Sequence, residues 1–174
     1  MNNQITIHEA VTEPDISTFG ERLLLPPEEI IPFTVEQLQN PEDWQLIKLE
    51  NGFLEAIGEP SLSDEKKERL KAAVATKQIT FLIARRGCRA VGLCSVSTCY
   101  STFVCGEIGI FDDFYVEPCF RGKGIARLLA EAAQRWCAEQ GIGSLTVCCA
   151  PCDEEMYQSL GFMMRLGATF SWTP

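Results

Sequence analysis

A short stretch of glycines and cations is the part of this sequence best suited to bind an anion. Gly122 and Gly124 flank Lys123, and Arg121 precedes them. Glycine lets the backbone bend sharply and places no side chain between a ligand and the backbone N–H groups. A patterned helix follows Gly124, so its positive N-terminal end would face the same anion. These residues are typical of a phosphate or pyrophosphate site, and a capped turn with two solvated cations is the alternative.

Two common nucleotide-binding motifs do not fit this loop. A P-loop carries Lys followed by Ser or Thr after its last glycine, whereas Lys123 lies between the glycines and Ile125 follows them. A dinucleotide-binding loop needs a small residue three places after its second glycine, where this sequence has Arg127. The loop therefore disfavours ATP and dinucleotide chemistry.

The residues before the loop predict a strand that carries two carboxylates. Residues 114–116 are aromatic or β-branched, and Pro118 removes the backbone donor that further pairing would need. Asp112 and Asp113 stand directly before them. Because side chains alternate along a strand, these two are expected on opposite faces, with only one facing a substrate.

The loop and its surroundings resemble the GNAT superfamily of N-acyltransferases. Residues 121–126, Arg-Gly-Lys-Gly-Ile-Ala, are similar to that family's pyrophosphate loop for acyl-coenzyme A, and residues 112–118 resemble its fourth strand. Residues 157–162 resemble its Tyr-x-x-x-Gly-Phe signature. The resemblance implies acetyl-CoA as co-substrate and no metal. The residues that it implies for coenzyme binding are Phe114, Tyr115, Val116, Arg121, Gly122, Lys123, Gly124, Ile125 and Ala126.

The resemblance also implies where the pantetheine arm of the coenzyme lies. In the family, the strand before the loop and the strand after the helix splay apart, and the arm bonds to exposed backbone between them. The backbone of Tyr115 and Val116 would bond the arm here. A backbone N–H near Val116 would donate a hydrogen bond to the carbonyl oxygen of the thioester. This sequence departs from the family at Ala150, where many relatives carry an asparagine that bonds the arm.

Acetyl transfer to an amine implies a base and an acid. A free alkylamine has a pKa of about 10.4, so a carboxylate must help to remove its proton. Asp112 is the first candidate, because many relatives carry a glutamate at that position; Asp113 is the second and Glu107 the third. Tyr157 of the signature is the candidate acid that protonates the departing thiolate. A purely structural aromatic wedge is the alternative for Tyr157.

Size and charge narrow the class of partner. The 174 residues suit one domain, 1–174. The net charge of −9 disfavours nucleic acid and anionic membranes as partners and favours small cationic substrates. The sequence has no apolar run of about 20 residues and no basic, apolar leader, so a cytoplasmic location is expected. A homodimer is compatible with these features.

The nine cysteines are expected to be reduced thiols, because their number is odd and several lie in or near predicted strands. Cys148, Cys149 and Cys152 form the tightest cluster. They do not supply four zinc ligands at zinc-finger spacing, so no metal site is expected.

The order of elements, together with the resemblance, implies an α+β fold. Helices are expected to flank one mixed, mostly antiparallel sheet with a central splayed parallel strand pair. Residues 25–63 contain five prolines and are expected to hold a helical insertion that walls the acceptor site or only packs on the core. A helix over 41–57 is expected to break at Asn51-Gly52. The other expected strands are 4–10, 79–85, 90–100, 106–116, 145–149 and 163–172, and the other expected helices are one ending near Leu24, 63–78, 124–140 and 152–160.

The resemblance implies an N-acetyltransferase that moves the acetyl group of acetyl-CoA to a primary amine by direct attack in a ternary complex. The acidic composition favours a small cationic acceptor, such as a polyamine, an aminoglycoside or an amino acid. A protein lysine or N-terminal acetyltransferase and a non-catalytic acyl-CoA-binding module are the alternatives.

Overall fold

A five-stranded sheet in the order β1-β2-β3-β4-β5 organises the chain. The computed structural model describes residues 32–167 and Trp172. The first four strands pair antiparallel, and β5 pairs parallel to β4. The strands are β1 Phe33–Gln37, β2 Ile79–Arg86, β3 Arg89–Ser101, β4 Gly106–Val116 and β5 Leu145–Val147, and the helices are α2 Trp44–Ala56, α3 Asp64–Ala75, α4 Ile125–Glu139 and α5 Glu154–Ser159. The predicted α+β fold with a mixed sheet is confirmed.

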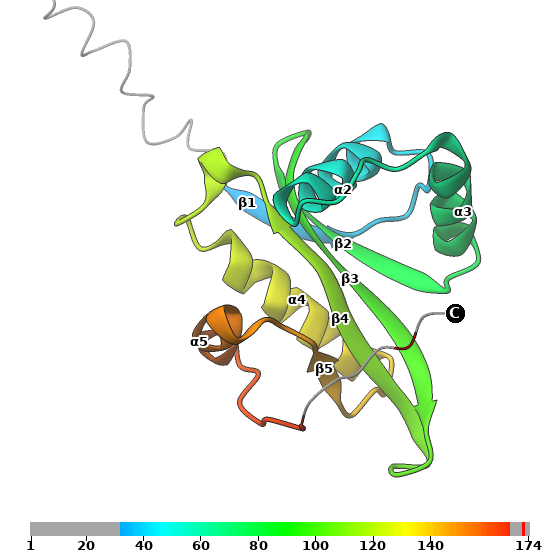
Figure 1. Cartoon of the computed structure of the whole chain (residues 1–174), viewed down its shortest axis with the longest axis vertical. Coiled ribbons are helices and arrows are strands. Elements are labelled where there is room, and N and C mark those ends of the chain that lie inside the picture. The colour runs from blue at the N-terminus through cyan, green and yellow to red at the C-terminus, as the bar shows by residue number, and fades with distance from the viewer. Residues whose placement is uncertain (1–31, 168–171, 173–174) are drawn as a thin grey trace, which may run out of the picture. The chain divides into compact units, whose positions relative to one another are not determined.

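Helices cover both faces of this sheet. Figure 1 shows α2 and α3 on one face and α4 on the other. On the α4 face, buried side chains such as Val96, Phe111 and Leu129 form one apolar cluster. On the α2 face, Leu49, Phe81 and Leu93 belong to a second cluster. The sheet therefore separates two cores, and β4 contributes side chains to both.

Local signals place most of these elements where the sequence predicts them. The N-cap Ser63 accepts a hydrogen bond from the Lys66 N–H and starts α3. A tight turn at Gly87, with φ of +60°, joins β2 to β3. The helix α4 begins after Gly124 and forms the crossover connection from β4 to the parallel strand β5.

The segment 25–63, expected to hold a helical insertion, contains both a strand and a helix in the part that the structure describes. Its strand β1, which was not predicted, pairs antiparallel with β2 and forms the edge of the sheet. The alternation of half-buried Phe33 and Val35 with exposed Thr34 is the ordinary signature of such a strand. The expected strand 4–10 and the helix after it lie outside the described residues.

The predicted break in the helix at Asn51-Gly52 is wrong, because α2 continues without interruption to Ala56. Glycine costs about 1 kcal/mol in a helix interior, yet a Cβ at Gly52 would stand 2.9 Å from the Tyr115 ring. The glycine thus allows α2 to approach β4 closely. The Asn51 side chain accepts a hydrogen bond from the Leu62 N–H, which holds the chain after α2.

The expected final strand at 163–172 does not form in the part that is described, since residues 162–167 adopt no regular element. Residues 168–171 lie outside the described part.

None of the described helices is both long and apolar enough to cross a membrane.

Candidate functional site

The pairing between the strands β4 and β5 ends in the middle of β4. Their pairing covers only three residue pairs and ends at Phe111 opposite Val147. From Asp112 to Val116, β4 therefore continues without a strand partner on its β5 side among the described residues. Figure 1 shows the short β5 beside the longer β4. Unpaired strand backbone of this kind can bond an extended ligand arm as an added strand would.

The glycine loop connects the end of β4 to α4. Gly122 and Gly124 have φ of +72° and +80°, a region that only glycine enters without strain. Gly124 is the N-cap of α4 and has no side chain to accept from the N–H groups of the first turn. Those N–H groups have no acceptor inside the helix, so they remain available to an anion.

Two cations flank these N–H groups, and both are held in place. The Arg121 Nε donates to the Val116 carbonyl oxygen at 2.9 Å, and the guanidinium lies 5.9 Å from the Tyr115 ring centroid. The Lys123 ammonium lies 5.1 Å from the Phe120 ring centroid. Both residues are exposed, so their charges can reach a ligand at the helix terminus.

The other residues predicted to bind the coenzyme contribute through different groups. Ile125 is 1% exposed, so only its backbone can meet a ligand. Phe114 and Val116 pack into the core on the α4 face. Tyr115 packs into the core on the α2 face. Ala126 is half-buried in the first turn of α4.

A β-bulge lies in β4 at the two aspartates. The register to β3 changes from Leu93 opposite Tyr115 to Ser95 opposite Asp112, which leaves one extra residue in β4. Asp113 has φ of +46°, an uncommon value that Asp tolerates better than most residues. Its carboxylate accepts a hydrogen bond of 2.7 Å from the Ser95 hydroxyl.

The bulge overturns the expectation that the two aspartates occupy opposite faces. Asp112 stands directly across from Ser95, and paired residues of neighbouring strands share a face. Asp113 bonds that same Ser95. Both carboxylates therefore lie on the α2 face, and each raises the pKa of Glu50 on α2. Strict alternation fails here because the bulge inserts one residue into the count.

Glu50 is the residue of this site that the sequence did not reveal. It is 6% exposed, and Oε2 has no hydrogen-bond partner among the described residues. Burial, followed by the charges of Asp113 and Asp112, raises its pKa from 4.5 to about 8. The missed signal is a carboxylate at an apolar position, since Leu46, Leu49 and Glu50 share the buried face of α2.

Glu50 is expected to make the protein less stable as the pH rises. Its pKa is about 8 in the folded protein and near 4.5 in the unfolded chain, so the folded state holds the extra proton between these values. Stability should then fall across this window by up to about 1.4 kcal/mol per pH unit. Glu50→Gln removes this dependence, because glutamine does not titrate. Urea unfolding at pH 5, 6, 7, 8 and 9 measures the difference.

Exposed Glu55 on the same helix provides the control. The variant Glu55→Gln changes the net charge equally and should keep the pH dependence of the parent protein. Parallel stability curves for the parent and Glu50→Gln would contradict the assignment.

Tyr157 lies in an aromatic cluster beside the point where the strands separate. Its ring centroid is 6.0 Å from that of Phe114, 6.4 Å from that of Phe111 and 5.9 Å from that of Phe162. Burial raises the pKa of Tyr157 to about 12, and the charges of Cys149, Asp153 and Asp112 add to this shift. The hydroxyl therefore keeps its proton and can donate a hydrogen bond at any working pH.

The third candidate base, Glu107, lies outside this arrangement. It is exposed and five residues before Asp112 on β4, which places it about 17 Å away along the strand. Arg85 near the end of β2 is paired with the carboxylates of Glu36 and Asp43. The described residues contain no cluster of His, Cys, Asp and Glu that could hold a metal ion.

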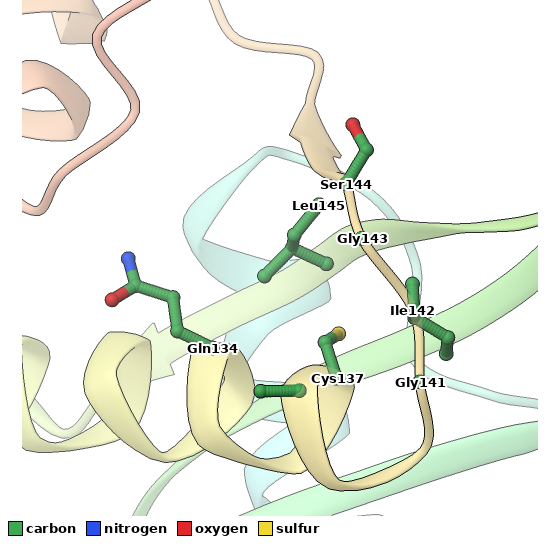
Figure 2. Close-up of a pocket in the computed structure, with 8 residues that line it drawn as sticks. Gln134, Cys137, Gly141, Ile142, Gly143, Ser144 and Leu145 are labelled. Carbon is green, nitrogen blue, oxygen red and sulfur yellow. The ribbon is translucent and has the colours of Figure 1, made fainter. Parts of the chain in front are cut away.

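A shallow hollow of about 500 Å³ lies near the other end of α4 (Figure 2). Its helical lining begins at Gln134, ten residues after Gly124, which is about 15 Å along the helix axis. This hollow is therefore separate from the glycine loop. It is lined by Gln134, Cys137, Ala138, Gly141, Ile142, Gly143, Ser144 and Leu145.

The sequence model of the acetyltransferase (GNAT) family matches residues 44–162. The match covers more than half of the chain and includes the bulge, the unpaired edge of β4, the glycine loop and Tyr157. This chain belongs to the GNAT family of acetyltransferases. It is therefore a transferase, and the family's acetyl donor is acetyl-CoA. No curated protein matches the chain.

Solved structures share the GNAT fold at low sequence identity. An aminoglycoside acetyltransferase from an uncultured soil metagenomic sample, crystallised with sisomicin, is 17% identical with a TM-score of 0.70, over 82% of this chain and 95% of that chain. Glucosamine-6-phosphate N-acetyltransferase from Arabidopsis thaliana is 18% identical with a TM-score of 0.64, over 82% and 98%. A predicted acetyltransferase from Clostridium acetobutylicum, crystallised with acetyl-CoA, is 18% identical with a TM-score of 0.66, over 82% and 95%.

Proposed function

We propose that this GNAT protein transfers the acetyl group of acetyl-CoA to a primary amine of a small cationic acceptor. The observation that carries the proposal is that β4 brings three functional features together. This one strand holds two carboxylates at its bulge, an unpaired edge beside β5 and the glycine loop at its end. A donor anchored at the loop and extended along the unpaired edge would bring its thioester to the carboxylates. Two solved relatives in fold are named for acetylating amino sugars, which agrees with a small amine acceptor.

Asp112 is the proposed base. It is exposed at the first residue after the β4–β5 pairing ends, so water and an acceptor amine can both reach it. Asp113 is the alternative base, but its carboxylate already accepts from Ser95, and burial raises its pKa. The amine attacks the thioester carbonyl directly, its proton passes to the base, and the coenzyme departs as a thiolate.

The remaining tasks fall to the coenzyme-binding backbone and to Tyr157. Residues 121–126, with Arg121 and Lys123, would hold the pyrophosphate, and an N–H near Val116 would stabilise the charge that develops on the carbonyl oxygen. Tyr157 would donate to the departing sulfur. With a pKa of about 12, its hydroxyl donates a hydrogen bond to a thiolate more readily than it gives up the proton completely.

A panel of amines assayed with acetyl-CoA for thiol release tests this function. Turnover with at least one small cationic amine is the expected result. Turnover only with lysine peptides or N-terminal peptides would support a protein acetyltransferase instead. Coenzyme binding without turnover of any amine would favour a non-catalytic acyl-CoA-binding module.

The variant Tyr157→Phe is expected to lower the rate of acetyl transfer by up to ~10²-fold, the lower part of the range for general acid catalysis. An alkyl thiol has a pKa of about 8.5, so its thiolate leaves tolerably without help. The ring keeps its contacts to Phe111, Phe114 and Phe162, so coenzyme affinity and thermal stability should hardly change. Single-turnover kinetics across the pH range measure the effect. A rate within about twofold of the parent would leave Tyr157 a packing residue.

A further inference from the structure

Three carboxylates converge between α2 and the bulge of β4. Asp112 and Asp113 share the face of the sheet that α2 covers, and both act electrostatically on Glu50. These two aspartates are the charged groups that raise the pKa of Glu50, and both come from β4. The Oε2 atom of Glu50 is buried without a hydrogen-bond partner among the described residues.

Such an arrangement is unfavourable for the protein alone. Ionisation of a buried carboxyl group that has no partner costs several kcal/mol, and two like charges nearby add to that cost. The cations near α2 are committed elsewhere, since Lys48 and Arg89 both pair with Glu117. The helix thus buries an unpaired acid near two further acids, which an apolar residue at the same position would avoid.

The ammonium group that reacts cannot balance these charges throughout the reaction. An amine must lose its proton before it attacks the thioester, and the product amide is neutral. One ammonium group therefore brings a positive charge only until the reaction begins. Charge that persists through the reaction has to come from another part of the acceptor.

We propose that Glu50 is a specificity residue that binds a second cationic amine of the acceptor, so that the preferred substrates are diamines, polyamines or amino sugars with two or more ammonium groups. This inference rests on the proposed function and adds the class of acceptor. Glu50 is mostly protonated at pH 7 in the free protein, and binding of the second ammonium drives its ionisation. Binding of a dication should then release a proton to the solvent.

A matched pair of acceptors tests the specificity. Pentylamine and 1,5-diaminopentane have the same chain and differ by one ammonium group. The parent enzyme should prefer the diamine by ~10-fold or more in kcat/KM, as expected for a partly buried ion pair. Glu50→Gln should remove most of this preference, chiefly by raising KM for the diamine, and should lower kcat/KM for pentylamine much less. Glu55→Gln should keep the preference.

Calorimetry of 1,5-diaminopentane binding in buffers of different ionisation enthalpy provides a readout independent of turnover. The parent should release close to one proton per diamine at pH 7, and Glu50→Gln should release close to none. A parent that shows no preference for the diamine, or equal losses on both amines in Glu50→Gln, would overturn the proposal. Proton release that is the same in the parent and in Glu50→Gln would also overturn it. Acetylation of neither amine, nor of any other amine in the panel, would instead refute the proposed function.

Discussion

Gly124→Glu is expected to lower the affinity for acetyl-CoA by ~100-fold or more. The substitution places a carboxylate at the N-cap of α4, where the proposed pyrophosphate meets the N–H groups of the first turn. Like charges in direct contact cost several kcal/mol, and about 1.4 kcal/mol corresponds to a factor of ten. Calorimetric titration with acetyl-CoA measures the affinity. An unchanged affinity in a folded Gly124→Glu protein would remove the loop from the coenzyme site.

Two control variants separate charge from backbone strain. Gly141 follows α4 at its other end and has φ of +74°, close to the +80° of Gly124, and an added Cβ there meets no atom within 4 Å at either position. Gly141→Glu therefore adds the same charge and similar strain away from the loop. It should lower thermal stability but leave coenzyme affinity unchanged. Gly124→Ala adds strain of about 1–2 kcal/mol without charge, so its affinity should lie closer to the parent.

The loop was predictable because all its signals are local. The two glycines, the two cations and the start of an amphipathic helix lie within a few residues of each other. The strands from Ile79 to Val116 were predictable for the same reason, since each is a β-branched or alternating run that ends at a turn. The resemblance to the GNAT family likewise rests on the order of these local motifs and not on any single residue.

The acidic cluster was not predictable, because each part of it depends on a partner far away in sequence. From the sequence alone, Gly52 is interpreted as a helix breaker, because nothing nearby in the sequence indicates that the Tyr115 ring fills the space beside it. With α2 divided at that point, the pattern that puts Glu50 on the buried face was lost. The bulge likewise depends on the register between β3 and β4. The local sign of the bulge is the pair of adjacent aspartates, because Asp is disfavoured in strands.

Asp112→Asn is expected to lower turnover by roughly 10²- to 10⁴-fold near neutral pH, the range for general acid–base catalysis. Without the base, the amine must lose its proton in solution, and only about 0.1% of an alkylamine with a pKa near 10.4 is neutral at pH 7.4. The rate of the variant should therefore climb about tenfold per pH unit toward the pKa of the amine. Coenzyme affinity should stay the same. Steady-state kinetics from pH 6 to 10 with a diamine acceptor measure the shift of the profile.

Asp113→Asn is the matched comparison, because asparagine fits the geometry of both positions. Asn tolerates the φ of +46° at residue 113 and can still accept the hydrogen bond from Ser95. At residue 112, an amide oxygen can likewise accept from the N–H of residue 113, as the Asp112 carboxylate does at 3.1 Å. Each variant thus removes one charge and preserves the bulge. If only Asp113→Asn shifts the pH profile, the base is Asp113, and Asp112 contributes its charge to acceptor binding; if neither variant shifts it, the amine loses its proton to water.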